Sequence, residues 1–371
     1  MIKEGEKMIG FTAASNYSFF ICIWMAISQF KNDQKCIVLY DEIKDIDHIG
    51  NKLKELKIFD VVKVIHVNRN TQIGNWKRRY HMFFINKEIQ EICELYRFHK
   101  FIFFTNDPLN IPFIISKVYK KNPDCEFAFG EEGIGVYYNK EAYLPTPRID
   151  FWLSLLRRKK YLRMLKVLYV REPSLLTYPS NLDVRKIAPC VDTEKLHQII
   201  NALWRHQSLP DMPLFLMQQP FSEDDKNQIG IDENANLLFN RICERFPGLT
   251  ALKLHPRTRN YILPKNAFVI DKNIQFENSL NNSINQKTII SINSTASFSP
   301  YLLWGYTPNI ILLYKLFNWG ENQQSRFGKL DKFLTNFSTL YAKRGGKIFV
   351  PQNESELFRI LDRVMNRGKN E

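Results

Sequence analysis

Short apolar runs, most of them without a polar break, recur along the whole chain, and apolar residues follow helical spacing between many of them. Continuous apolar runs are typical of strands that a parallel sheet buries on both faces. Strands are therefore predicted at residues 8–12, 36–40, 61–67, 100–105, 126–129, 213–218, 249–253, 267–269, 288–292, 309–313 and 347–350. Helices are predicted at residues 46–56, 86–96, 233–246, 297–305 and 356–367. This alternation predicts an α/β fold with parallel sheets.

A long basic stretch separates the two groups of strands, so we expect two domains. The 371 residues suffice for two hydrophobic cores. We expect an N-terminal domain over residues 1–190, which includes a basic linker segment at 151–171. A C-terminal domain would cover 191–350, and residues 351–371 would add a C-terminal helix.

The chain carries a formal net charge of +14, which favours an anionic partner. No RRM, KH, zinc-finger or helix-turn-helix signature accompanies the charge, so we do not expect nucleic acid to be that partner. Segment 151–171 has seven basic residues, no acidic one, and apolar residues between them. It is predicted as a helix that either lies on an anionic membrane or packs on its own protein with its basic groups in water.

Six cysteines are scattered without a CxxC motif, which indicates a reducing compartment rather than a disulfide or zinc framework. The N-terminus shows no signal-peptide pattern, and the apolar stretch 19–27 is too short to span a bilayer. We expect a cytoplasmic protein, peripheral on the inner face of the cell membrane.

Polar and ionisable residues gather just after several predicted strands. In doubly wound sheets ligands bind at the carboxyl ends of the strands, so these segments are the candidate site. They are residues 13–18, 105–108, 130–135, 218–223, 254–259 and 292–297.

Segment 130–135, GEEGIG, places two neighbouring carboxylates, Glu131 and Glu132, before Gly133. Glycines permit tight turns and close approach of a ligand. Neighbouring carboxylates push their pKa values apart, which can leave one of them suitable as a general base. Taken alone, the segment could also be a solvated turn.

Two further segments suit a phosphate group. In LHPRTR, His255 precedes Pro256 and is followed by Arg257, so an imidazole that can donate to a phosphate oxygen lies beside a cation. In SINSTAS, Asn293, Ser294, Thr295 and Ser297 precede a predicted helix, where hydroxyls and backbone N–H groups can bind an anion. The alternatives are a surface histidine and an ordinary N-cap.

The order of these three motifs resembles that of the bacterial sialyltransferases, which share a (D/E)(D/E)G, an HP and an S(S/T) motif. Here the motifs are Glu131-Glu132-Gly133, His255-Pro256 and Ser294-Thr295. The resemblance is closest to glycosyltransferase family 52, the lipooligosaccharide sialyltransferases, and the capsular polysialyltransferases come next. The family often has Asp where this chain has Glu131 and Glu132.

The resemblance implies a GT-B fold, in which two Rossmann-like domains with parallel sheets face a central cleft. The N-terminal domain would serve the acceptor and the C-terminal domain the CMP-sugar. By analogy Glu132 is the base, His255 acts on the CMP phosphate, and Glu131 belongs to the same catalytic motif. The donor phosphate would be bound by Ser294, Thr295, Asn293 and Pro256, and further donor or acceptor contacts would come from Gly133, Ser15, Asn16, Gln219 and Arg257.

The implied reaction is an inverting transfer of sialic acid from CMP-sialic acid to a hydroxyl, with galactose as the expected acceptor sugar. The acceptor would be a lipooligosaccharide or capsular glycan, and no metal or other cofactor would be needed. The expected partners are the CMP-sugar, the glycan acceptor and an anionic membrane contacted through 151–171, and a homo-oligomer is compatible with the sequence.

Three alternatives differ in chemistry. A CDP-glycerol-type glycerophosphotransferase typically has two functional histidines, whereas His197 and His206 fall in one predicted helix. A metal-dependent transferase would use Asp45 and Asp47 as a DxD motif, but these residues read as a helix start. A non-catalytic module that binds anionic polymers or membranes would explain the charge but not the three motifs.

Overall fold

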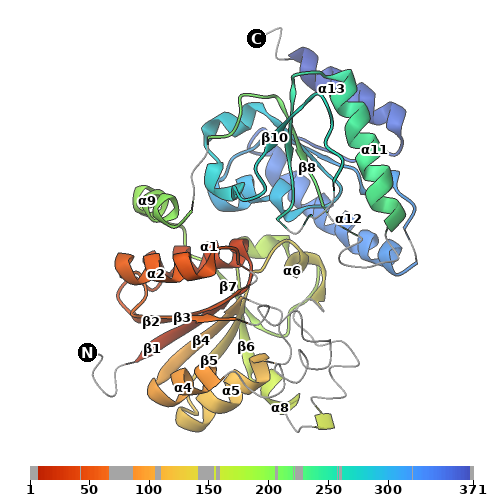
Figure 1. The fold of residues 1–371 in the computed structure, drawn as a ribbon. Helices are drawn as coiled ribbons and strands as arrows, with labels where there is room; N and C mark the ends of the chain where they lie inside the picture. The colour runs from red at the N-terminus through yellow and green to blue at the C-terminus, as the bar shows by residue number, and fades with distance from the viewer. Residues whose placement is uncertain are drawn as a thin grey trace. The chain divides into compact units, whose positions relative to one another are not determined.

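The computed structural model describes residues 7–41, 43–66, 87–104, 110–140, 154–155, 159–204, 208–219, 221, 229–256, 258, 261–319 and 321–367. The chain divides into two compact units, Met1–Trp204 and Arg205–Glu371. Each unit has its own parallel β-sheet with helices packed on it (Figure 1). The predicted architecture of two α/β domains is confirmed.

The sheet of the first unit has seven parallel strands in the order β3-β2-β1-β4-β5-β6-β7. The strands are β1 Met8–Ala13, β2 Gln34–Tyr40, β3 Val61–Ile65, β4 Phe98–Phe104, β5 Glu126–Gly130, β6 Leu165–Val170 and β7 Asp183–Lys186. The helices are α1 Asn16–Ile27, α2 Ile46–Leu56, α4 Lys87–Leu95, α5 Asn110–Lys121, α6 Gly135–Tyr138, α8 Lys159–Leu162 and α9 Thr193–Leu203, with a 3-10 turn η2 at Pro173–Leu175. Figure 1 shows α1 and α2 on one face of the sheet and α4 and α5 on the other.

Close packing between β4 and β5 fixes the end of β5. A side chain on Gly130 would meet the ring of Phe104, because an added Cβ would lie 2.1 Å from a ring carbon. Only glycine therefore fits at the last position of β5, directly before the two carboxylates.

The prediction of one basic helix over 151–171 is wrong. Residues Leu165–Val170 form strand β6, which pairs with β5 and β7, and only α8 and residues 154–155 are helical within this segment. Residues 151–153 and 156–158 lie outside the described part of the chain. The physical reason is tertiary: Val167, Tyr169 and Val170 are buried in the sheet, where branched and aromatic side chains pack well.

The division between the units also differs from the expected boundary at residues 190 and 191. Helix α9 lies in the first unit, where it contacts α1 and α2, so the second unit begins at Arg205. Strand β7 was not predicted, because this short edge strand is polar and only partly buried.

The sheet of the second unit has six parallel strands in the order β10-β9-β8-β11-β12-β13. They are β8 Leu214–Met217, β9 Thr250–Lys253, β10 Ala267–Ile270, β11 Thr288–Ser291, β12 Asn309–Leu312 and β13 Ile348–Phe349, and each overlaps a predicted strand. The α-helices are α11 Ile229–Arg245, α12 Glu321–Ala342 and α13 Glu354–Arg367. Shorter helical turns are η4 Glu277–Ser279, η5 Asn282–Gln286, η6 Thr295–Ser297, η7 Pro300–Trp304 and η8 Tyr314–Leu316.

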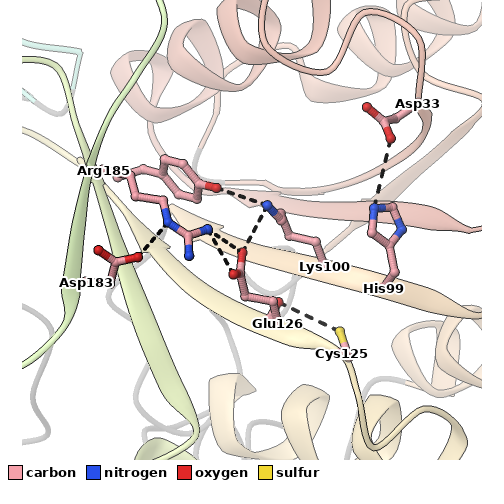
Figure 2. Close-up of polar contacts among 8 residues, drawn as sticks. Asp33, His99, Lys100, Cys125, Glu126, Asp183 and Arg185 are labelled. Atoms are coloured by element: carbon pink, nitrogen blue, oxygen red, sulfur yellow. Dashed lines mark hydrogen bonds and ion pairs between the residues drawn. The ribbon is translucent and has the colours of Figure 1, made fainter.

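A polar network joins strands β4, β5, β6 and β7 of the first unit (Figure 2). Glu126, the first residue of β5, accepts from Arg185 Nη1 at 3.0 and 2.9 Å and lies 3.0 Å from Lys100 Nζ. Lys100 also donates to the Tyr169 hydroxyl at 3.1 Å, and Arg185 pairs with Asp183 at 2.7 Å. Strand β5 thus begins with a carboxylate neutralised by two cations and ends just before the candidate catalytic pair.

Within the described residues, no helix combines the length and apolar character that crossing a membrane requires.

Candidate active site

Glu131 lies at the carboxyl end of β5 and is fully buried, with 0% of its surface exposed. Its Oε1 accepts a hydrogen bond from the Tyr17 hydroxyl, and its Oε2 accepts one from the Tyr137 hydroxyl. The backbone N–H of Arg171, just after β6, donates to Oε2 at 2.7 Å. Residues that follow β1, β5 and β6 therefore meet at one carboxylate.

The start of α1 brings Tyr17 to this carboxylate. Ser15 caps the helix, because its Oγ accepts from Ser18 N at 3.1 Å while Ser18 Oγ accepts from Ser15 N at 3.0 Å. This capping box fixes the first turn and commits the Ser15 side chain to the helix end. Asn16 Oδ1 is enclosed there without a hydrogen-bond partner among the described residues.

The electrostatics around Glu131 are those of a buried acid with several donors. Burial raises the pKa of Glu131, while hydrogen bonds from Tyr137 and Tyr17 and the neighbourhood of Arg171 act in the opposite direction. Burial likewise raises the pKa of Tyr137, so its hydroxyl keeps its proton and remains a donor. The Arg171 guanidinium lies 3.7 Å from the ring centroid of Trp24, so a cation is held beside this acid.

Glu132 is in a different environment from its neighbour, because it is only half-buried. The next residues, Gly133 and Ile134, lead into the short helix α6. Gly133 and Gly135 do not have positive φ, and a Cβ on Gly135 would meet nothing within 4 Å. The backbone conformation therefore does not require glycine at position 135. Close approach of a ligand remains the predicted reason for glycine there.

In the second unit, His255 is half-buried, two residues after β9 ends at Lys253. Its backbone N–H donates to Gln218 Oε1 at 3.1 Å, and its carbonyl accepts from Thr258 N at 3.0 Å. The Thr258 hydroxyl donates to the same Gln218 oxygen. The segment after β9 is thus bonded to the segment after β8. Pro256 is exposed, and Arg257 lies outside the described residues.

The loops after β8 and β11 are joined by a reciprocal pair of hydrogen bonds. Gln219 Nε2 donates to Asn293 Oδ1 at 3.0 Å, and Asn293 N donates to Gln219 Oε1 at 2.9 Å. Both residues were predicted from their positions after strands, and the structure brings them together.

The serine–threonine turn differs from the predicted helix N-terminus. Residues Thr295–Ser297 form a 3-10 turn, and a π-helix follows at Pro300–Trp304 instead of an α-helix over 297–305. Ser294 Oγ caps the turn by accepting from Ala296 N at 3.3 Å, and Ser297 Oγ lies 2.8 Å from Ser291 Oγ in the core. So short a turn has little macrodipole, and two of the expected hydroxyls have structural partners. Thr295 is half-buried in the first turn.

The predicted site did not include two interacting ionisable residues of the second unit, Lys253 and Glu277. Lys253 is only 6% exposed, and burial lowers its pKa to about 8. Burial raises the pKa of Glu277, whose carboxylate interacts with Lys253 and with the Ser299 hydroxyl. Lys253 could have been noticed because a charged residue ends an otherwise apolar strand.

The Asp45–Asp47 motif lies at the start of α2, as predicted. Asp47 Oδ1 is 3.0 Å from His66 Nε2, and Asp41 Oδ2 is 3.8 Å from His66 Nδ1. Among the described residues, no three His, Cys, Asp or Glu side chains are grouped so that they could hold a metal ion. His197 lies in α9, and His206 falls outside the described residues.

Two α/β domains, each built on a parallel sheet, are the architecture of the GT-B fold class. The fold is shared with the UGT2 structure of Phytolacca americana in complex with UDP-2fluoro-glucose and pterostilbene. The TM-score is 0.50 at 8% sequence identity, over 94% of this chain and 86% of that one.

The family model of the alpha-2,8-polysialyltransferases matches residues 20–311, and the chain belongs to this family. It is therefore a sialyltransferase, as the three motifs predicted, and the matching family is the one they placed second. A search among curated protein sequences finds no match.

Two solved bacterial sialyltransferases have similar structures. The alpha/beta-galactoside alpha-2,3-sialyltransferase of Photobacterium phosphoreum has 11% identity and a TM-score of 0.48, over 93% of this chain and 99% of that one. The GT-B domain of the sialyltransferase of Photobacterium damselae has 13% identity and a TM-score of 0.44, over 93% and 100% of the two chains.

Proposed function

We propose that the protein transfers sialic acid from CMP-sialic acid to a hydroxyl of a bacterial surface glycan, with inversion and without a metal ion. The observation that carries the proposal is the contrast within the carboxylate pair. Glu131 is enclosed by three hydrogen-bond donors, and Glu132 beside it is half-buried. By analogy with the sialyltransferase motif the base is one of these two carboxylates, and the contrast favours Glu132.

In this proposal Glu132 removes the proton of the acceptor hydroxyl as the hydroxyl oxygen attacks the anomeric carbon of the donor. The C–O bond to the phosphate breaks, and CMP leaves with the negative charge. His255 donates a hydrogen bond or a proton to the departing phosphate, and Thr295 and Ser294 contribute to binding it. Fixed donors aimed at developing charge supply the largest share of catalysis in many enzymes.

The acceptor is proposed from two observations. The name of the matching family specifies alpha-2,8 linkage between sialic acids, which favours a sialylated acceptor over the terminal galactose that the motifs alone suggested. The net charge of +14 suits a growing polyanionic chain. The enzyme would then extend a capsular or lipooligosaccharide glycan on the cytoplasmic side of the membrane.

Membrane attachment is proposed from charge alone. The amphipathic helix expected at 151–171 is replaced in part by β6, so only the basic residues of this segment that precede β6 support contact with anionic lipid.

The proposed function is tested by incubating the purified protein with CMP-sialic acid and a galactoside or a sialylated oligosaccharide. CMP release and the transferred sugar are measured with and without EDTA, and CDP-glycerol serves as the competing donor. We expect transfer of sialic acid with inverted configuration that EDTA does not reduce. Turnover of CDP-glycerol alone would overturn the proposal.

A further inference from the structure

The peptide group that joins Leu254 to His255 is held from both sides. Its carbonyl oxygen accepts a hydrogen bond from Lys253 Nζ at 2.8 Å. Its N–H donates to Gln218 Oε1 at 3.1 Å. The orientation of this peptide plane sets the direction in which the His255 side chain leaves the backbone, so the two contacts bear directly on His255.

Lys253, which holds the carbonyl of this peptide group, is an unusual lysine because it is only 6% exposed. Its ammonium group also donates to the Lys272 carbonyl at 3.3 Å. The charges of Glu277, in η4, and Asp271, just after β10, attract it. Burying a lysine costs desolvation free energy, and here one of its hydrogen bonds ends on Leu254, the residue directly before His255.

The Gln218 side chain completes the arrangement. Its Oε1 accepts from both His255 N and the Thr258 hydroxyl, and the backbone N–H of Gln218 donates to the Lys253 carbonyl at 3.0 Å. The Gln218 side chain thus bonds the loop on both sides of Pro256, the residue that directly follows His255. The loop cannot turn without breaking several of these bonds together.

We propose that Lys253 and Gln218 are positioning residues that fix the Leu254–His255 peptide and so aim the His255 imidazole at the leaving phosphate. This inference rests on the proposed function, in which His255 acts on CMP. A displacement of about 1 Å at a catalytic group can reduce the rate on the order of 10²-fold.

The positioning role has a consequence in the pH profile. Burial lowers the pKa of Lys253 to about 8, so its ammonium loses its proton as the pH rises through that value. The neutral amine has one hydrogen-bond donor fewer and no charge, and we expect turnover to fall. Consider a pH between this folded-state pKa of about 8 and the higher, ordinary pKa of lysine. In this window the unfolded chain binds more protons than the folded one, so Lys253 makes the fold more stable as the pH rises. Loss of turnover in this window is therefore not loss of the fold.

The test compares Lys253→Met and Gln218→Met with the conservative variants Lys253→Arg and Gln218→Glu. We expect both methionine variants to lower single-turnover transfer by about 10- to 100-fold while CMP affinity stays within about threefold of wild type. Gln218→Glu keeps the acceptor oxygen and should restore most of the transfer rate. Lys253→Arg cannot lose its proton, so its transfer rate should lack the decline near pH 8. Lys265→Met, which removes an exposed lysine of the same unit, is the matched control.

His255→Ala separates this inference from the function on which it rests. If His255→Ala transfers sialic acid like wild type, the proposed role of His255 is wrong. If His255→Ala is inactive while Lys253→Met and Gln218→Met transfer normally, only the positioning role is overturned. If Lys253→Arg does not fold, the comparison of Gln218→Met with Gln218→Glu tests the positioning role by itself. Equal transfer rates for these two variants would overturn that role.

Discussion

The hydroxyl of Tyr17 donates a hydrogen bond to Oε1 of Glu131, a residue 114 positions further along the chain. This contact joins the first turn of α1 to the end of β5, and both residues are buried. Because Tyr137 and the backbone N–H of Arg171 donate to Oε2, both carboxylate oxygens of Glu131 accept hydrogen bonds inside the protein. Glu132, which is half-buried, thus differs from its neighbour in environment.

Replacement of Glu132 tests the proposed base. Glu132→Gln keeps the size of the side chain and removes the basic carboxylate. A base acts only in the transition state, so we expect the single-turnover rate to fall by about 10²–10⁴-fold with CMP affinity unchanged. Rapid-quench transfer and CMP titration are the measurements, and a near-normal rate would remove Glu132 from the mechanism.

Replacement of Glu131 should act on folding more than on chemistry. In Glu131→Gln an amide NH₂ replaces one acceptor oxygen and faces buried donors from Tyr17, Tyr137 or Arg171. We expect the free energy of unfolding to fall by about 1–3 kcal/mol. The transfer rate of the folded fraction should fall less than in Glu132→Gln. The opposite order of rates would exchange the roles of the two carboxylates.

Tyr17→Phe should weaken the fold in a pH-dependent way. Burial raises the pKa of Glu131 and the Tyr17 hydrogen bond opposes that rise, so the variant raises the folded-state pKa further. Where the folded state binds more protons, stability falls as the pH rises. The loss of unfolding free energy, about 1 kcal/mol or more, should therefore be larger at neutral than at acidic pH. Urea unfolding at several pH values measures it, with Tyr119→Phe on an exposed tyrosine as control.

Glu126→Gln should affect stability without affecting transfer. Although burial acts in the opposite direction, the hydrogen bonds and charges of Lys100 and Arg185 lower the pKa of Glu126. An acid with a lowered folded-state pKa stabilises the fold above its unfolded-state pKa, and this contribution disappears as the pH falls through the folded-state value. Because these side chains are partly exposed, we expect a loss of only about 1 kcal/mol at neutral pH, which high salt and acid both reduce. A lowered transfer rate at full folding would contradict the structural role.

Vesicle binding tests the proposed membrane contact. Neutralising Arg157, Arg158, Lys159 and Lys160 together should release the protein from anionic vesicles, because each basic contact contributes about 1 kcal/mol. Transfer to a soluble acceptor should stay close to wild type. Of these four residues the structure describes Lys159 and Lys160, which begin helix α8, whereas Arg157 and Arg158 lie outside the described residues. Binding that neither the substitutions nor salt reduces would exclude this segment as the contact.

Much of the fold was readable from local sequence. Each predicted strand of the second unit overlaps an observed one, because continuous apolar runs such as residues 288–292 can be satisfied only in a buried sheet. The failures lie where local and tertiary preferences compete. The spacing of basic residues in 151–171 predicted a helix, but part of this segment forms β6, which pairs with β5 and β7. Strand β7 was not predicted because its sequence is polar and contains no apolar run.

For the candidate site, the sequence by itself determined the residue types, their order and the sialyltransferase class, because short motifs need no distant partner to be recognised. Only the tertiary structure decided which carboxylate is enclosed, which hydroxyls are used in caps, and that Lys253 lies beneath the His255 loop. The physical reason is distance along the chain. Burial and hydrogen bonds depend on residues such as Tyr17 and Gln218, which only the completed sheets bring to Glu131 and His255.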